Sequence, residues 1–150
     1  MSEEEFGEFV PFSRSAYAED KMRANNLTKE EADKIAHADF ERYLPDGFKT
    51  KDSYLNVVTD DEETYLGHLW FVVRGEKGSR KAFIADIQMN IEHRGKGFGR
   101  KAMLLLEEEV KKYGATHIGL HVFGFNSGAI HLYQSLNYET TDLVMEKKIN

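Results

Sequence analysis

The sequence predicts a single α/β domain in which helices cover both faces of a mixed, strongly curved sheet. Two helical segments open the chain, and from Tyr54 onward the apolar pattern changes to β-branched and aromatic runs. A later helix joins two of the predicted strands, which is the connection that parallel strands require. With 150 residues, of which 41% are hydrophobic, the chain can bury one core, so the domain is expected to span residues 1–150.

The two N-terminal helices are predicted from capping signals and apolar spacing. Apolar residues recur at helical intervals after the first capping signal, and a second helix runs to about Leu44. Pro11 implies a kink or a break in the first helix, and a short strand over residues 6–12 is the alternative. The two capping-box pairs are Ser2 with Glu5 and Thr28 with Glu31.

Three strands follow as a meander, at Tyr54–Val58, Tyr65–Val73 and Ala82–Met89. After a glycine-rich loop, the apolar face of residues 101–112 predicts a helix. This helix forms a crossover, which places the next strand, residues 117–123, parallel to the third. A further helix at Ala129–Leu136 and a final strand at Leu143–Lys148 complete the expected elements.

Composition limits the functions that are open to the chain. The formal net charge of -6 argues against a general nucleic-acid binder, because phosphate neutralisation needs a basic face. The absence of cysteine excludes disulfides, thiolate metal sites and cysteine nucleophiles. No secretory signal or apolar run of membrane-spanning length is present in the sequence. We therefore expect a cytoplasmic protein that contacts neither nucleic acid nor membrane.

The loop after the third strand has the features of an anion site. It reads Arg94-Gly95-Lys96-Gly97-Phe98-Gly99, and Arg100 and Lys101 follow directly. A strand that leads through a glycine-rich turn into a helix presents free backbone N–H groups at the positive end of the helix dipole. Cations at that end oppose the dipole, so their presence indicates an anionic ligand, and phosphate is expected.

The spacing of the glycines separates three phosphate-binding families. A P-loop is excluded, since Gly95-Lys96 lacks the upstream glycine and is followed by Gly97. The segment from Gly97 to Ala102 fits the dinucleotide pattern, but residues 120–123 supply no acid at the position about 20 residues onward. The third pattern, Arg/Gln-x-x-Gly-x-Gly/Ala, matches residues 94–99 at every fixed position. In this loop the chain resembles the GNAT superfamily of N-acetyltransferases.

Residues 126–138 resemble the second signature of that family, Asn-x-x-Ala-x-x-Leu-Tyr-x-x-x-Gly-Phe. Asn137 and Tyr138 replace its last two residues, and asparagine tolerates the left-handed conformation of a helix C-cap. Taken alone, Asn126 could be a plain N-cap and Tyr133 a core residue. The joint occurrence of both motifs favours a ligand site. The resemblance covers roughly residues 65–138, about half of the chain.

The resemblance implies that the third strand splays apart from its parallel neighbour and that coenzyme A enters between them. Backbone groups of Ile87, Gln88 and Met89 would contact the pantetheine arm. The loop from Arg94 to Arg100 would hold the pyrophosphate, and Asn126 is a further expected cofactor contact. The implied activity is direct transfer of an acetyl group from acetyl-CoA to an amine acceptor.

The same resemblance makes Tyr133 the proton donor for the departing thiolate, and an N–H of the splayed strand, that of Met89, would polarise the thioester carbonyl. His121 is the first candidate for the base, because its unperturbed pKa of about 6.5 suits proton removal. A packed or solvent-facing histidine is the alternative. Asp86 stands in an apolar run, so it is expected to be partnered or functional. It could orient His121, bind the acceptor amine or cap a turn.

Several alternatives remain open on the sequence alone. His68 is expected either to contact substrate or to face solvent from its strand. The other histidines show no metal-ligand spacing, and no metal is expected. Edge strands of such a sheet can pair between chains, which leaves a homodimer open. A non-catalytic acyl-CoA-binding or sensor module of the same fold is the rival to the enzyme.

Overall fold

A computed structural model describes residues 1–149, and its sheet has the strand order β1-β2-β3-β4. β1 to β3 pair as an antiparallel meander, and β4 is parallel to β3. The predicted meander with one parallel strand added is therefore confirmed. The strands are β1 (Ser53–Thr59), β2 (Tyr65–Arg74), β3 (Arg80–Met89) and β4 (Ala115–Leu120).

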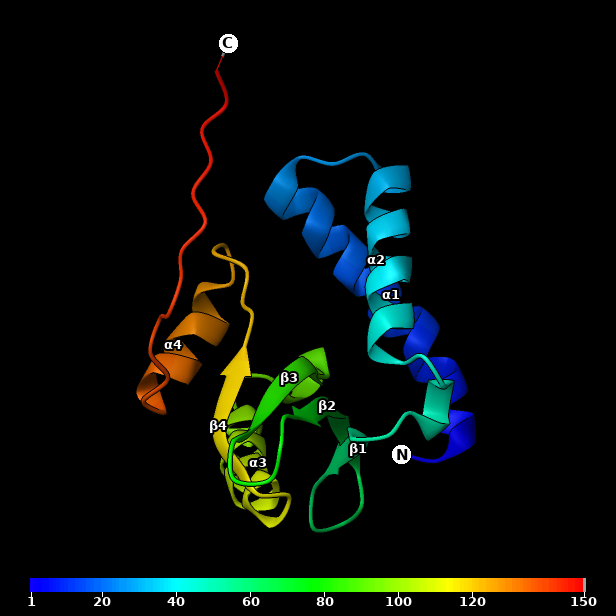
Figure 1. The fold of residues 1–150 in the computed structure, drawn as a ribbon, viewed down its shortest axis with the longest axis vertical. Coiled ribbons are helices and arrows are strands. Elements are labelled where there is room, and N and C mark those ends of the chain that lie inside the picture. Colours follow the sequence, from blue (N-terminus) through cyan, green and yellow to red (C-terminus); the bar gives the residue numbers. More distant parts are fainter. Residues whose placement is uncertain (150) are drawn as a thin grey trace.

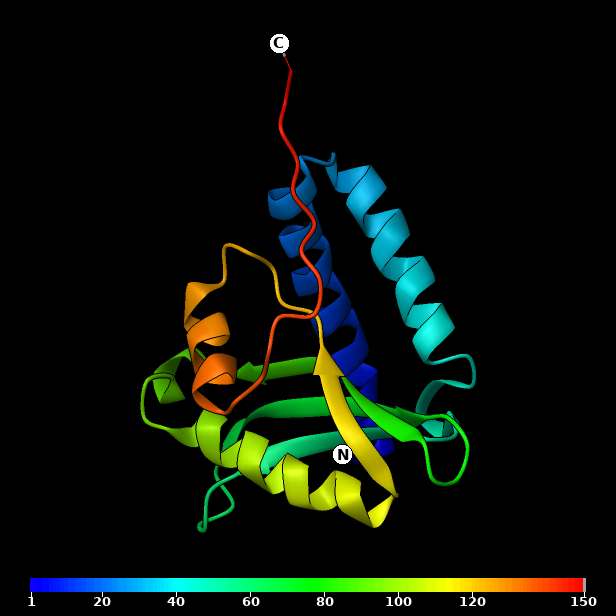
Figure 2. The ribbon, with the colours of Figure 1, turned by 60° about the vertical axis from the view of Figure 1, so that its left-hand side comes forward.

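Helices cover both faces of this twisted sheet (Figures 1 and 2). α1 and α2 lie against one face, where Phe9 and Phe40 pack with Trp70 of β2. α3 and α4 lie on the other face. Short 3-10 turns at Gly47–Lys49 and Ile91–His93 connect the elements. The helices are α1 (Glu3–Asn25), α2 (Lys29–Tyr43), α3 (Phe98–Lys112) and α4 (Ser127–Ser135).

α1 runs through Pro11 as one helix of 23 residues, so the break and the alternative strand over residues 6–12 are wrong. Proline removes one backbone hydrogen bond from a helix. Here that loss is offset by the capping box at Ser2 and by burial of Phe9 and Ser13 on either side of the proline. The helix therefore continues past the proline and buries Phe9, Ser13 and Ala18.

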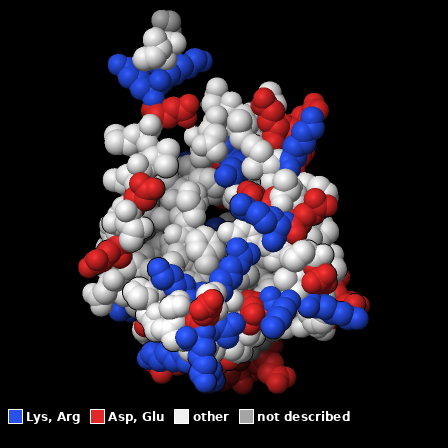
Figure 3. Space-filling view, in the orientation of Figure 1, with Lys and Arg blue, Asp and Glu red and all other residues white. Residues whose placement is uncertain are grey.

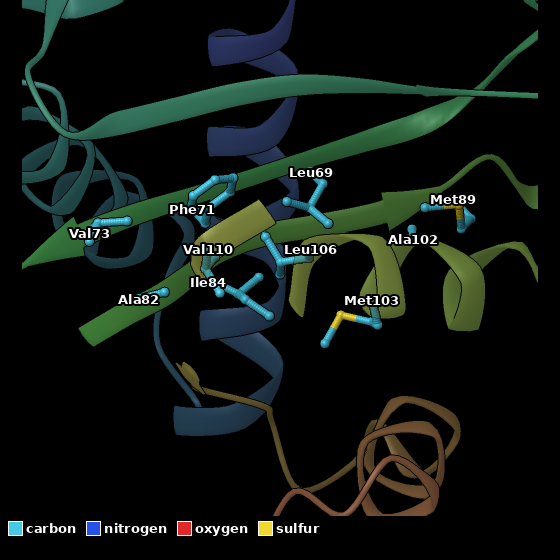
Figure 4. Packing of buried hydrophobic residues seen from close by; sticks show 10 residues of the cluster. All are labelled: Leu69, Phe71, Val73, Ala82, Ile84, Met89, Ala102, Met103, Leu106 and Val110. Carbon is cyan, nitrogen blue, oxygen red and sulfur yellow. The ribbon is translucent and has the colours of Figure 1, made fainter. Parts of the chain in front are cut away.

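The main core lies between β2, β3 and α3 (Figure 4). α3 presents apolar residues at intervals of three and four, which face the alternate residues of the two strands. This packing fixes the start of α3, and so the loop before it, relative to the end of β3. The cluster consists of Leu69, Phe71, Val73, Ala82, Ile84, Met89, Ala102, Met103, Leu106 and Val110.

β3 contains a bulge at Ala85. Trp70 of β2 pairs with Asp86, whereas the next residue, Phe71, pairs with Ile84, so Ala85 is the extra residue. Side chains alternate between faces along a strand, and an extra residue reverses that alternation. Asp86 therefore faces the α1 side of the sheet instead of sharing the α3 side with Ile84.

β3 and β4 pair over only part of their length. Their register ends at the pair Ile84 and Leu120, while β3 continues alone on that side to Met89. The predicted splay between the parallel strands is therefore confirmed. Backbone groups of residues 85–89 on this side of β3 have no strand partner within residues 1–149.

The predicted final strand, Leu143–Lys148, is wrong. Residues 139–149 are in no helix or strand, and they extend away from the rest of the molecule (Figures 1 and 2). A strand requires a neighbouring strand for its backbone hydrogen bonds. The segment has the composition of a strand, but it meets no such neighbour within residues 1–149.

Candidate functional site

The face seen in Figure 3 is hollowed at its centre. Uncharged side chains line the hollow, and Lys and Arg side chains gather along its lower rim. In the same orientation, α4 lies on one side of the hollow and α1 with α2 on the other, above β3 and β4 (Figure 1). The cleft thus lies over the splay, where β3 and β4 part.

The glycine loop enters this region with an open N–H array. Gly95 and Gly97 have φ of 72° and 85°, the left-handed region that glycine adopts without strain. Gly97 is the N-cap of α3 and supplies no side-chain cap. The bond from Lys101 N to Gly97 O, at 3.1 Å, starts the helical ladder, so the N–H groups before it have no intrahelical acceptor. This is an anion-binding arrangement.

Basic side chains surround the same loop but differ in their contacts. Arg94 donates from Nε to the carbonyl of Met89 at 2.8 Å, which ties the loop to the end of β3. Arg100 donates from Nη1 to Ser135 Oγ at 2.8 Å and links α3 to α4. Lys96 is exposed. Two of the basic side chains, Arg94 and Arg100, thus fix the geometry of the loop, and Lys96 is left exposed beside it.

Close backbone packing fixes the position of the splayed end of β3. Gly67 of β2 lies against Gln88, where an added Cβ would stand 2.1 Å from the Gln88 carbonyl oxygen. Only glycine fits such an approach. Ile87, Gln88 and Met89, the expected pantetheine contacts, are therefore held on a rigid strand with one free edge.

Asp86 is partnered, as its place in an apolar run predicts. Its Oδ2 accepts a hydrogen bond from the Ser13 hydroxyl of α1 and lies 3.0 Å from His68 Nε2 of β2. Ser13 and His68 are each only 3% exposed. The suggested contact with His121 is not among the hydrogen bonds of the described residues. The network instead joins α1 to the bulged strand.

His68 is buried, so the solvent-facing position considered for it is wrong. Its ring lies edge-on to Phe9, with centroids 4.8 Å apart, and Phe12 is next to it at 6.3 Å. Burial of an imidazole needs a hydrogen-bond partner, and Asp86 supplies one. His68 therefore positions the Asp86 carboxylate and is shielded from solvent.

Tyr133 lies on α4, and its side chain faces the main core. It packs partly buried against the main cluster, and its ring centroid lies 5.9 Å from that of Tyr138. Burial raises the pKa of the Tyr133 phenol, and the negative charge of Asp86 raises it further. The phenol is therefore protonated at neutral pH. That is the state in which it can donate a proton.

His121 lies just beyond β4, which ends at Leu120, so it is on the following loop and not within the strand as predicted. Its ring is edge-on to Phe123 at 5.0 Å. Burial lowers the pKa of His121 below 6.5, and the charge of Lys21 on α1 lowers it further. The imidazole is thus neutral at pH 7 and able to accept a proton.

Asn126 acts as the N-cap of α4, because its side-chain oxygen accepts from Ala129 N at 3.2 Å. This is the structural role weighed for it from sequence. The cap fixes the start of the helix that carries Tyr133, about two turns further along.

Asp20 on α1 is a further acid of this region that the sequence did not single out. Burial raises the pKa of its carboxyl, Arg23 opposes this rise, and the negative charges of Glu19 and Asp86 add to it. The same part of α1 contacts the loop after β4, where Arg23 lies 4.0 Å above the Phe125 ring. No local pattern indicates this, since the contact joins segments about 100 residues apart.

Comparison with known proteins identifies the family. The model of the acetyltransferase (GNAT) family matches residues 16–138. The chain belongs to the GNAT acetyltransferase family. Across 149 residues this GNAT chain is 32% identical to the uncharacterized N-acetyltransferase YycN of Bacillus subtilis, covering 99% of the chain and 96% of YycN. The uncharacterized N-acetyltransferase YdgE of the same organism is 30% identical over 149 residues, or 99% and 95% of the two chains.

Solved structures agree with this assignment. The crystal structure of YycN from Bacillus subtilis matches this GNAT chain with a TM-score of 0.94 and 31% identity, covering 100% of the chain and 96% of YycN. A Pyrococcus furiosus protein described as an acetyl transferase matches with a TM-score of 0.69 and 25% identity, covering 95% of each chain. Among residues 1–149, no helix is long and apolar enough to cross a membrane.

Proposed function

We propose that this GNAT acetyltransferase transfers the acetyl group of acetyl-CoA to the nitrogen of a cationic amine. The observation that supports this most directly is Tyr133, a phenol kept protonated by burial and by Asp86 at the splay of β3 and β4. A protein that only binds acyl-CoA has no need of a proton donor there. YycN and YdgE are both named as N-acetyltransferases, which supports transfer to nitrogen.

The residues present fit coenzyme A. The open N–H groups at the start of α3, together with Lys96, suit a pyrophosphate. The unpaired edge of β3 over residues 85–89 offers backbone donors and acceptors to an amide-containing arm. When bound, acetyl-CoA supplies the activated thioester, and the chain supplies orientation and proton transfer.

The acceptor is proposed to be cationic because two acids lie on the α1 side of the splay. Asp86 and Asp20 both contribute negative charge there, and the charge of Asp86 raises the pKa of both Asp20 and Tyr133. They would attract an ammonium group and hold it close to the reacting carbonyl. The amine must lose a proton before it attacks, and the neutral imidazole of His121 is the proposed acceptor of that proton, directly or through water.

Tyr133 completes the proposed reaction by giving its proton to the departing sulfur. The bond between nitrogen and the acetyl carbon forms as the bond between carbon and sulfur breaks. The attacking nitrogen then loses its remaining extra proton to solvent, and solvent returns a proton to the phenol. The enzyme forms no covalent intermediate in this scheme. General acid catalysis of this kind typically contributes about 100-fold to 10,000-fold in rate.

The test replaces Tyr133 with phenylalanine and measures release of free thiol from acetyl-CoA across polyamines, aminoglycosides and peptides with lysine or N-terminal amines. We expect turnover to fall by about 100-fold or more, with unchanged affinity for coenzyme A. Tyr54→Phe is the matched control, because Tyr54 packs in the core beside Phe71, at 4.9 Å between ring centroids, and lacks a proposed role.

Unchanged turnover in Tyr133→Phe would remove the proton donor from the proposal. If the wild-type chain binds coenzyme A but acetylates none of these amines, the result supports the binding or sensor module instead.

A further inference from the structure

The outer edge of β4 is unprotected. β4 is the last strand of the sheet, and Thr116, His117 and Gly119 are exposed along it. Proteins usually protect such edges with proline, lysine or a covering segment, because unpaired N–H and C=O groups accept a strand from another chain. β4 contains neither proline nor a lysine, arginine or acidic residue. Its edge is therefore suited to receive a further strand.

A segment suited to pair with such an edge stands free in the same chain. We call residues 143–149 the C-terminal arm, and Figures 1 and 2 show it extended beyond the body of the protein. Large apolar side chains on a monomer are normally buried, and a contiguous exposed run marks an interaction site. The exposed fractions are 76% for Leu143, 93% for Val144, 90% for Met145 and 79% for Ile149.

We propose that the C-terminal arm forms the fifth strand on the β4 edge of a second copy of this chain, and that the second copy returns its own arm in exchange. Edge and arm are both unpaired within residues 1–149, although one chain carries both. A two-fold exchange satisfies both in each copy and leaves no further site open, so the assembly closes as a dimer.

The pattern of the arm fits a strand with one buried face. By the two-residue period, one side carries three large apolar residues and one lysine, and the other side carries one apolar and two charged residues. The first side consists of Leu143, Met145, Lys147 and Ile149, and the second of Val144, Glu146 and Lys148. In both ribbon views the arm runs in the same general direction as its own β4 (Figures 1 and 2). A two-fold axis across the strands reverses that direction, so the partner's arm meets β4 antiparallel, which is the more stable pairing.

The area available is sufficient for a stable dimer. Seven residues of extended chain expose roughly 1,200 Å², by the scaling of unfolded surface with mass. Burying about half of each arm, with equal area on each receiving edge, removes roughly 2,400 Å² in total, above the 1,200 to 2,000 Å² of ordinary specific interfaces. The proposal does not depend on the catalytic roles assigned above.

The first test compares the mass in solution of the full chain and of arm variants by light scattering over a range of concentrations. We expect twice 17.3 kDa for the full chain and 17.3 kDa for Met145→Asp at the same concentrations. The dimer dissociation constant should rise at least about 100-fold in that variant. Leu105→Asp is the matched control, because Leu105 on α3 is 72% exposed and is outside both the arm and β4.

The second test uses the absence of cysteine in the chain to locate the contact. His117→Cys in β4 and Met145→Cys in the arm are introduced into separate chains with different tags, mixed, and treated with a short bismaleimide. We expect a linked product that contains both tags. Three results would overturn the proposal: a wild-type monomer at all concentrations, a dimer that Leu105→Asp disrupts as strongly as Met145→Asp, or a dimer without the mixed product.

Discussion

Replacing Asp86 with alanine should destabilise the protein far more than loss of a surface charge. The Asp86 carboxylate accepts from Ser13 and lies 3.0 Å from His68 Nε2, and both partners are 3% exposed. A buried polar group left without a partner costs about 1–3 kcal/mol. Two such groups would cost about 2–6 kcal/mol. The side chain of Asp86 is itself 25% exposed, so water can replace part of its contacts, and we expect about 3 kcal/mol.

Urea unfolding measures this loss directly. A free energy of about 3 kcal/mol corresponds to a midpoint lower by roughly 1.5 M, for a slope of about 2 kcal/mol per molar. Ser13→Ala should cost only about 1 kcal/mol, because Asp86 keeps His68 and its solvent contact. Ser13→Ala combined with Asp86→Ala should lower the free energy of unfolding by less than the sum of the two single substitutions, because both residues belong to one hydrogen-bond network.

Glu108→Ala serves as the control for this series. Glu108 pairs with Lys111 on the surface, and the two side chains are 71% and 63% exposed, so its loss should have little effect. If Asp86→Ala and Glu108→Ala shift the midpoint equally, the buried network is not a stabilising feature, and the reasoning from its contacts fails.

Two further predictions follow from named contacts. The acid limb of kcat/KM against pH should lie below 6.5, because burial and the charge of Lys21 lower the pKa of His121. Lys21→Gln should move this limb to higher pH, because it removes a repelling charge. An unmoved limb would exclude His121 as the titrating base. Gly67→Ala should lower the free energy of unfolding in urea by at least about 2 kcal/mol, since the added Cβ would lie 2.1 Å from the Gln88 carbonyl oxygen. Gly128→Ala is the control and should be nearly neutral, because a Cβ there meets nothing within 4 Å. Equal effects of the two substitutions would contradict the close approach at Gly67.

The anion loop could be predicted from sequence because its determinants are local. Gly95 and Gly97 adopt positive φ where the turn requires it. The positive end of the helix dipole is there because α3 begins at Phe98, directly after Gly97. The same applies to Asn126, whose cap of α4 depends only on the next three residues. Features of this kind need no knowledge of the tertiary structure.

The partners of Asp86 could not be predicted, because they depend on a bulge and on a distant helix. Strand periodicity alone would assign Asp86 to the face of Ile84, and only the extra residue at Ala85 turns it toward α1. Ser13 reaches it from 73 positions earlier in the chain. The sequence does indicate that an acid in an apolar run needs a partner, but it does not say which one.

The C-terminal arm illustrates the same limit for strands. Its composition predicts a strand, yet a strand exists only when another backbone completes its hydrogen bonds. Residues 143–149 meet no such backbone in the part of the chain that the structure describes. The proposed exchange would make the prediction correct for the dimer while it remains wrong for the single chain.

The bulge at Ala85 connects the stability of the fold with the chemistry proposed for the cleft. It turns the Asp86 carboxylate toward Ser13 of α1 and His68 of β2, and the same charge raises the pKa of Tyr133. Besides weakening the proposed attraction of a cationic amine, loss of Asp86 would therefore have two separable effects. It would lower the free energy of unfolding through the unpaired groups, and it would lower the pKa of the Tyr133 phenol by removing a negative charge. A pH profile of Asp86→Ala, taken at a temperature where the variant is fully folded, would isolate the second effect as an alkaline limb displaced to lower pH.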